Sequence, residues 1–147
     1  MAMVLVIAIL VLCGTLGIRI LRGSLRVANL DKTAIPILMY HNVAPWSSSF
    51  TEENKELTVK PEDFVAQMEY LSKNGFTPMT LKKLHEIWRT NQPMPEKPIV
   101  LTFDDGDHGI YQYAYPVARQ YRFPFVVFLI TRWTTVHTTF YMSKSEV

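Results

Sequence analysis

Short apolar runs that alternate with amphipathic segments constrain the fold of this chain more than any other feature. The runs Ile35–Tyr40, Ile99–Phe103 and Phe125–Ile130 have the length and apolar content of buried strands. Phe76 and Thr77 are expected to form a brief strand, whereas Asn42–Lys60 is polar, has no sustained period and is expected to be a surface loop. Strands that alternate with helices predict an α/β fold with a parallel sheet, either doubly wound or a partial barrel.

Helical spacing marks the segments between these runs. Pro61 suits a first helical turn, and Gly75 is expected to end that helix. Thr80 is an N-cap candidate for a second helix. The segment Tyr113–Tyr121 predicts a third helix, which tolerates Pro116 only near its first turn.

The amino end is uncharged over residues 1–18 and rich in Val, Leu and Ile. A helix of that length spans about 27 Å, close to the thickness of the hydrocarbon core of a membrane. Positive charge follows the apolar run instead of preceding it, which favours an uncleaved anchor over a signal peptide. We therefore expect a transmembrane anchor at residues 1–22, a linker at 23–34 and a folded domain at 35–147.

Charge and cysteine content exclude several classes of function. The net charge is +2, and Arg19, Arg22 and Arg26 account for the excess of bases over acids. The rest of the chain offers no basic face, so no nucleic-acid partner is expected. Cys13 is the only cysteine, which excludes an internal disulfide and the zinc sites that need several cysteines.

Two adjacent carboxylates, Asp104 and Asp105, follow the apolar run Ile99–Phe103. Burying them is costly unless a cation, a proton or hydrogen-bond donors offset the charge. Because Gly106 permits a bend, one aspartate can hold a divalent ion while the other takes a proton from water that attacks a carbonyl. The alternative is that the Asp-Asp-Gly turn only caps the next helix.

Four segments resemble the polysaccharide deacetylases, the NodB-homology group of carbohydrate esterases. TFDDG at Thr102–Gly106 is similar to the first motif of that family. The segments Ile37–Val43 (ILMYHNV), Pro61–Leu84 and Tyr113–Ile130 also resemble the family, in the same order. The resemblance covers Ile35 to about Ile130.

The resemblance implies a distorted (β/α) barrel with its site at the carboxyl ends of the strands. It also implies that Asp104 is the catalytic base and that Asp105 is a metal ligand. The implied reaction removes N-acetyl groups from N-acetylhexosamine units of a polysaccharide, with zinc or a similar divalent ion as cofactor. No substrate-binding residue is assigned.

The chain departs from the family pattern in its metal ligands. The family has a second motif, in which His-Ser/Thr is followed by another His four or five residues after the first. His137 and Thr138 are the only similar start, but Tyr141 and Met142 stand where the second imidazole would be. We therefore expect the chain to be the amino-terminal portion of a deacetylase domain, catalytically incomplete by itself.

Two other classes of protein remain open. A haloacid-dehalogenase-like phosphotransferase would use Asp105 and Asp107 as two carboxylates one residue apart, but His108 and Gly109 stand where that pattern needs Thr or Val. A non-catalytic product on a membrane anchor, which binds glycan or is inert, is the third interpretation. Phosphate release or acetate release distinguishes the two enzymes, and the inert product gives neither.

The remaining histidines and the location of the chain carry weaker expectations. His41 either points toward the metal or is a hydrogen-bonded structural imidazole, and His85 needs no function on its amphipathic helix. Asp107 and His108 are expected to be turn residues. The arginines after the anchor favour a cytoplasmic domain, whereas the resemblance implies a domain on the extracytoplasmic face.

Overall fold

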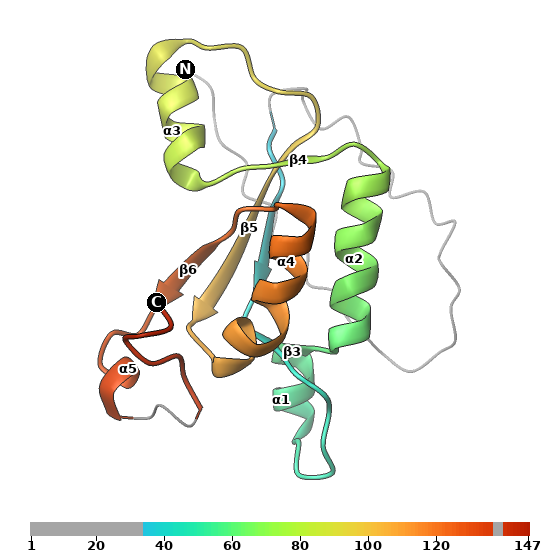
Figure 1. The fold of residues 1–147 in the computed structure, drawn as a ribbon, viewed down its shortest axis with the longest axis vertical. Helices are drawn as coiled ribbons and strands as arrows, with labels where there is room; N and C mark the ends of the chain where they lie inside the picture. Colours follow the sequence, from blue (N-terminus) through green and yellow to red (C-terminus); the bar gives the residue numbers. More distant parts are fainter. Residues whose placement is uncertain (1–33, 137–139) are drawn as a thin grey trace.

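The computed structural model describes residues 34–136 and 140–147. Its main sheet is built around β5 (Pro98–Asp105), which is central in Figure 1. The strand β1 (Ile37–Tyr40) pairs with one edge of β5, and β4 (Thr77–Pro78) and β6 (Val126–Leu129) pair with the other. Every pair is parallel, so the parallel sheet expected from the sequence is confirmed.

Backbone hydrogen bonds fix the order of the strands around β5. The Val100 N–H donates to the Pro36 carbonyl next to β1 at 3.0 Å, while the Ile99 carbonyl accepts from the Met79 N–H next to β4 at 2.9 Å. Successive residues of a strand direct their backbone groups to opposite edges. Consequently β4 lies beside the beginning of β5 and β6 beside its end, on the same edge.

One face of β5 packs against the helices α2 (Pro61–Lys73) and α4 (Tyr115–Tyr121), which stand side by side to the right of β5 in Figure 1. The Phe103 ring lies 5.1 Å from the Tyr40 ring and 5.9 Å from the Phe64 ring, measured between centroids. All three side chains are buried. Burial of each such ring stabilises the fold by about 1.5–3 kcal/mol, so this aromatic cluster is a large part of the core.

The opposite face of β5 packs against α3 (Leu81–Thr90). Val100 is fully buried there and lies in a second cluster with Leu84 and Ile87. Since side chains alternate along a strand, positions 100, 102 and 104 lie on this second face. Both faces of β5 are therefore covered, as is typical of a parallel sheet.

The helix boundaries follow from local chemistry that is visible in the sequence. Pro61 opens α2, and Gly75 lies just beyond its end with φ +69°, the left-handed conformation that glycine adopts without strain. The Thr80 hydroxyl accepts a hydrogen bond from the Lys83 N–H at 3.1 Å and so caps α3. These three predictions are confirmed.

The expectation that Asn42–Lys60 is a loop is wrong. The segment contains two short parallel strands and one helix between them. These elements are β2 (Asn42–Val43), α1 (Glu52–Leu57) and β3 (Thr58–Val59). None of the residues of α1 is buried, so the helix has no apolar period to reveal it.

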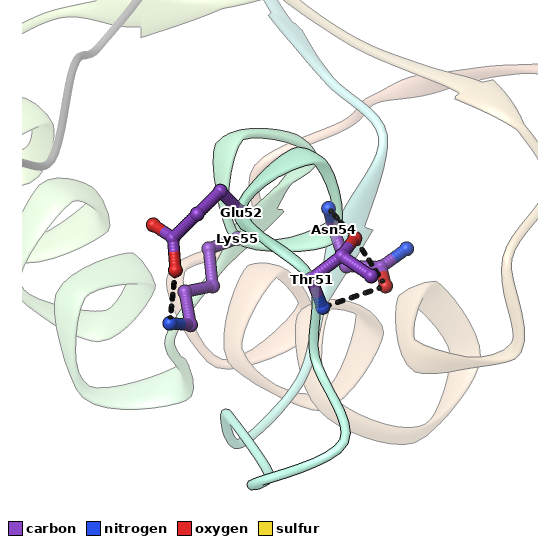
Figure 2. Close-up of polar contacts among 4 residues, drawn as sticks. All are labelled: Thr51, Glu52, Asn54 and Lys55. Atoms are coloured by element: carbon purple, nitrogen blue, oxygen red, sulfur yellow. Dashed lines mark hydrogen bonds and ion pairs between the residues drawn. The ribbon is translucent and has the colours of Figure 1, made fainter.

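The signal for α1 lies in its capping box instead. The Thr51 hydroxyl accepts from the Asn54 N–H at 3.2 Å, and the Asn54 side chain accepts from the Thr51 N–H at 3.1 Å (Figure 2). Asn replaces the usual Glu or Gln at the third helical position. An ion pair of 2.6 Å between Lys55 and Glu52, also drawn in Figure 2, adds a small contribution at the surface.

A π-helical turn, η1 (Ile110–Ala114), precedes α4. Pro116 lies in the first turn of α4, as the sequence predicts. Proline has no N–H to donate, and its ring would collide with the carbonyl of residue 112 in a regular helix. The wide turn, in which the Tyr115 N–H donates to the Ile110 carbonyl, accommodates the ring.

The predicted anchor at residues 1–22 and nearly all of the predicted linker at 23–34 lie outside the described residues. Within the two described ranges, no helix has both the length and the apolar character needed to cross a membrane. The last helix of those ranges is the short α5 (Trp133–Val136).

Candidate active site

Asp104 lies at the carboxyl end of β5, where the pairing of this strand with β6 ends. It is in register with Phe128 of β6 and is half-buried. It shares a face of the strand with Val100 and Thr102, opposite the face covered by α2 and α4. A carboxylate is therefore held by regular sheet structure at the strand end where parallel α/β proteins bind their ligands.

Asp105 leaves the strand with φ +66°, and Gly106 follows with φ +86°. A Cβ at Gly106 would lie 2.5 Å from Leu129 Cδ2, so the turn passes very close to β6. The Gly106 N–H donates to the Asp104 carbonyl at 2.8 Å. The bend at Gly106 expected from the sequence is thus present, and Asp105 shares it.

The acidic turn, residues 104–109, is held on one side by the segment 140–142. The Met142 N–H donates to the Gly106 carbonyl and the His108 N–H donates to the Phe140 carbonyl, both at 2.8 Å. Asp107 and Tyr141 face each other in this antiparallel bridge. Residues about 35 positions apart in the sequence therefore form one wall beside the two aspartates.

The strand β2 also contacts this turn, at Gly109. A Cβ at Gly109 would lie 2.1 Å from Asn42 Oδ1 and 2.3 Å from the Val43 carbonyl oxygen, so only glycine allows this approach. The Asn42 Oδ1 atom is buried there without a hydrogen-bond partner among the described residues. The turn is therefore clamped between β2 and the segment 140–142.

Asp107 is the residue of this turn whose electrostatics differ most from those of a free side chain. Burial and, to a smaller extent, the negative charge of Asp105 raise the pKa of its carboxyl group to about 6, although His41 opposes the rise. Burial also raises the pKa of Tyr141, to which the negative charges of Asp107 and Asp105 add. Asp105, Asp107, His41 and Tyr141 are thus close enough to interact through their charges.

His108 makes the polar contact that extends this wall toward the end of the chain. Its Nε2 lies 3.2 Å from Glu146 Oε1, and the other oxygen of Glu146 accepts from the Ser143 N–H at 2.8 Å. The backbone N–H and the hydroxyl of Ser143 both donate to Glu146 and lower its pKa, and His108 contributes to the same effect. His108 therefore has a local structural partner, beyond the role of a simple turn residue.

The described residues do not by themselves fit a zinc site. A catalytic zinc ion normally has three protein ligands. In residues 34–136 and 140–147, no group of three or more His, Cys, Asp or Glu side chains converges as a metal site requires. His137, the one histidine resembling the start of the second motif, lies outside these ranges.

The other candidate residues are distributed as follows. His85 is exposed on α3, as expected for a histidine without a function. One pocket, of about 410 Å³, is lined by residues of β6, of the segment that follows it and of the chain end. A second pocket, of about 430 Å³, is lined by residues of α4 and of the loop after it. Asp104 and Asp105 line neither of them. The acidic turn therefore lies outside both of these pockets.

Sequence reasoning missed the contribution of Tyr141 and treated Asp107 as a turn residue. The signal for Asp107 was its position two residues after Asp105, which gives three carboxylates within the four positions 104–107. Tyr141 carried no signal, because its position depends on pairing with a distant segment.

Comparison with known proteins finds similarity to the polysaccharide deacetylases. The family model described as polysaccharide deacetylase matches residues 91–146. The Bacillus subtilis (strain 168) protein YxkH, whose name places it provisionally among the polysaccharide deacetylases, is 34% identical over 96 residues, 65% of this chain and 32% of that protein. The poly-beta-1,6-N-acetyl-D-glucosamine N-deacetylase of Escherichia coli (strain K12) is 28% identical over 96 residues, 65% of this chain and 14% of the enzyme.

Solved structures agree with this assignment. The Streptococcus pyogenes deacetylase PplD, in complex with acetate, superposes with a TM-score of 0.67 and 27% identity, over 76% of this chain and 49% of PplD. A polysaccharide deacetylase from Bacillus cereus superposes with a TM-score of 0.62 and 31% identity, over 76% of this chain and 34% of that chain. The chain is thus a homologue of the polysaccharide deacetylases, and it spans about a third of YxkH and about half of PplD.

The close approach at Gly109 generates the first prediction. Replacing Gly109 with Ala forces a new Cβ against the backbone of Val43, which cannot move without displacing β2. We expect a loss of about 2 kcal/mol or more in the free energy of unfolding, measured by urea denaturation. The control Gln112→Ala, at an exposed position one turn away, should change it by less than about 0.5 kcal/mol. Equal stability of the two variants would contradict the clamp.

The pKa of Asp107 generates the second prediction. Because the pKa is higher in the folded chain (about 6) than its ordinary value of 3.8, the folded state binds the proton more tightly, and stability falls as the pH rises from about 4 to about 6. Above pH 6 the ionised carboxyl group destabilises the fold by about 1–3 kcal/mol. Asp107→Asn should therefore be more stable than the wild type at pH 7.5 and equal to it below pH 4.

The measurement is thermal and urea unfolding between pH 3.5 and 7.5 with a chelator present. The exposed Glu56→Gln variant serves as a control for removing one carboxylate. If the wild type and Asp107→Asn differ by the same amount at every pH, burial of the Asp107 charge is not the cause.

Proposed function

We propose that this chain carries the catalytic base and one metal ligand of an N-deacetylase acting on an N-acetylhexosamine polysaccharide. The observation that supports the proposal most is the position of Asp104, a half-buried carboxylate at the carboxyl end of the central parallel strand. The matched relatives include enzymes named as poly-beta-1,6-N-acetyl-D-glucosamine N-deacetylases. A glycan of this class is the substrate we propose.

In this proposal Asp104 takes a proton from the water molecule that attacks the acetamide carbonyl. The water oxygen forms a bond to the carbonyl carbon, and the bond between that carbon and nitrogen then breaks. The products are acetate and a free amine, whose nitrogen receives a proton. Among the described residues we assign no group to that last proton transfer.

Asp105 is the metal ligand in this proposal, and zinc is the ion we propose. A bound divalent ion would polarise the carbonyl oxygen and lower the pKa of water. Since the described residues supply no group of three ligands, we propose that the 147-residue chain alone holds zinc weakly and is catalytically incomplete. We further propose that its sheet is part of a distorted (β/α) barrel.

The roles of the two aspartates are tested in a chimaera, in which residues 35–147 replace the matching segment of PplD. We expect the chimaera to release acetate from N-acetylglucosamine oligomers in a zinc-dependent manner. Asp104→Asn should reduce the release at least about 100-fold, because the general base is lost, with unchanged zinc content. Unchanged turnover in this variant would refute the role of Asp104 as the base.

The matched variant is Asp105→Asn, which differs by one position and removes the same charge. It should lower the zinc content of the chimaera, measured by atomic absorption. Zinc content equal to that of the unsubstituted protein would refute the role of Asp105. Phosphate release from a phosphorylated substrate, with no acetate release, would favour the phosphotransferase interpretation instead.

We also propose that residues 1–22 anchor the chain in a membrane, with residues 35–147 on the extracytoplasmic face. The uncharged run of residues 1–18 supports the anchor, and the polysaccharide substrate supports the orientation. The three arginines after the run oppose this orientation.

The membrane prediction concerns both anchoring and orientation. The full chain should stay in the membrane fraction after an alkaline carbonate wash, and deletion of residues 2–22 should release it. An alkaline phosphatase reporter fused after Val147 should be active, because that enzyme functions only outside the cytoplasm. Release of the full chain by carbonate would contradict the anchor, and an inactive reporter would contradict the orientation.

A further inference from the structure

Two tyrosines stack on each other on the exposed side of η1 and α4. The exposed fractions of Tyr111 and Tyr115 are 42% and 43%. Their ring planes are within 5° of parallel, and the ring centroids are 6.2 Å apart. We call these two residues the tyrosine pair.

The core does not require the tyrosine pair. The opposite side of the same helical segment is anchored by Ile110, Ala114 and Ala118, all essentially fully buried. Large aromatic side chains left in solvent lose the free energy that burial would provide. The two rings are therefore available for contact with a ligand.

The tyrosine pair is continuous with the acidic turn. The Tyr111 ring lies 6.3 Å from the His108 ring, and His108 follows Asp107 directly. The helical segment thus begins at the turn, and the two tyrosines lie one after the other along it. A chain molecule whose reacting unit lies at the turn can continue across both rings.

An open groove of about 430 Å³ begins where the tyrosine pair ends. Its lining residues are Tyr115, Arg119, Arg122, Phe123, Pro124 and Phe125. Arg119 and Arg122 are exposed, and a guanidinium group offers several N–H donors to hydroxyl and carbonyl oxygens. The groove thus combines apolar walls with hydrogen-bond donors.

We propose that the tyrosine pair and this groove bind the N-acetylhexosamine chain beyond the unit that reacts at the acidic turn. This inference rests on the proposed function, and it adds the path of the polysaccharide. A pyranose ring has an apolar face of C–H groups that fits a flat aromatic ring, while its hydroxyl and acetamide groups remain available for hydrogen bonds. The two stacked rings lie along the helical segment that leads away from the acidic turn, which suits a chain molecule that extends from the turn.

The test measures binding of an N-acetylglucosamine pentasaccharide by calorimetry, with the full chain in detergent micelles and a chelator present. The parent protein carries Asp104→Asn, so that turnover cannot consume the ligand. Substituting Tyr111→Ala and Tyr115→Ala together should weaken binding about tenfold, which corresponds to about 1.4 kcal/mol for the loss of both rings. Tyr111→Phe with Tyr115→Phe keeps both ring faces and should bind within about twofold of the parent.

Tyr70→Ala is the matched control, because Tyr70 is also an exposed helical tyrosine but lies on α2. It should leave the affinity unchanged, and circular dichroism checks that every variant is folded. Unchanged affinity of the double Ala variant, or no binding by the parent, would overturn the proposal. So would a double Ala variant that loses self-association, detected by sedimentation, without losing affinity for the pentasaccharide.

Failure of this inference is distinguishable from failure of the proposed function. If the chimaera with PplD releases acetate but the double Ala variant binds as tightly as the parent, the tyrosine pair is not the path of the polysaccharide, although the function stands. If the chimaera releases no acetate, the proposed function fails whatever the tyrosine pair binds.

Discussion

Burial of β5 on both faces is the constraint on which the rest of the structure depends. Ile99, Leu101 and Phe103 pack beneath α2 and α4, and Val100 packs beneath α3. Neighbouring strands hydrogen-bond to both edges of β5. A strand fixed in this way has no freedom of register at its carboxyl end, because a slip of one position would exchange the two faces. The position of Asp104 therefore follows directly from the packing of the core.

The turn after β5 is positioned by a different kind of interaction. Once the chain leaves the sheet, two close approaches replace regular hydrogen bonding: Gly106 against Leu129 and Gly109 against β2. Backbone hydrogen bonds from the segment 140–142 add the second wall. Because these contacts come from three separate parts of the chain, the carboxylates of the turn depend on tertiary structure, whereas Asp104 depends mainly on its strand.

This difference explains how much could be predicted from the sequence. The strand β5, the end of α2 at Gly75 and the cap of α3 at Thr80 depend on local patterns, and each was predictable. The exposed helix α1 has a capping box with Asn54 but no apolar period, so the segment was taken for a loop. The docking of Tyr141 beside Asp107 could not be predicted, because no local pattern encodes a pairing between distant segments. The roles of Asp104 and Asp105 came from the resemblance of TFDDG to a family motif and stay predictions.

The charge of the acidic turn bears on why these residues are present at all. Asp104, Asp105 and Asp107 place three carboxyl groups within four positions, and burial together with the charge of Asp105 raises the pKa of Asp107 to about 6. At neutral pH an ionised Asp107 therefore lowers the stability of the fold. A turn selected only for stability would replace it with asparagine, which suits the same backbone. A cation that binds beside the turn would reverse the sign of this effect, because it would stabilise the ionised carboxylates more than the protonated ones.

The deacetylase and phosphotransferase interpretations both use Asp105 as a carboxylate beside a cation, and they differ in the second carboxylate. The first uses Asp104 in the sheet and the second uses Asp107 in the turn. The sheet fixes Asp104 independently of the turn, so a base at that position would keep its place even if a bound ion displaced the turn.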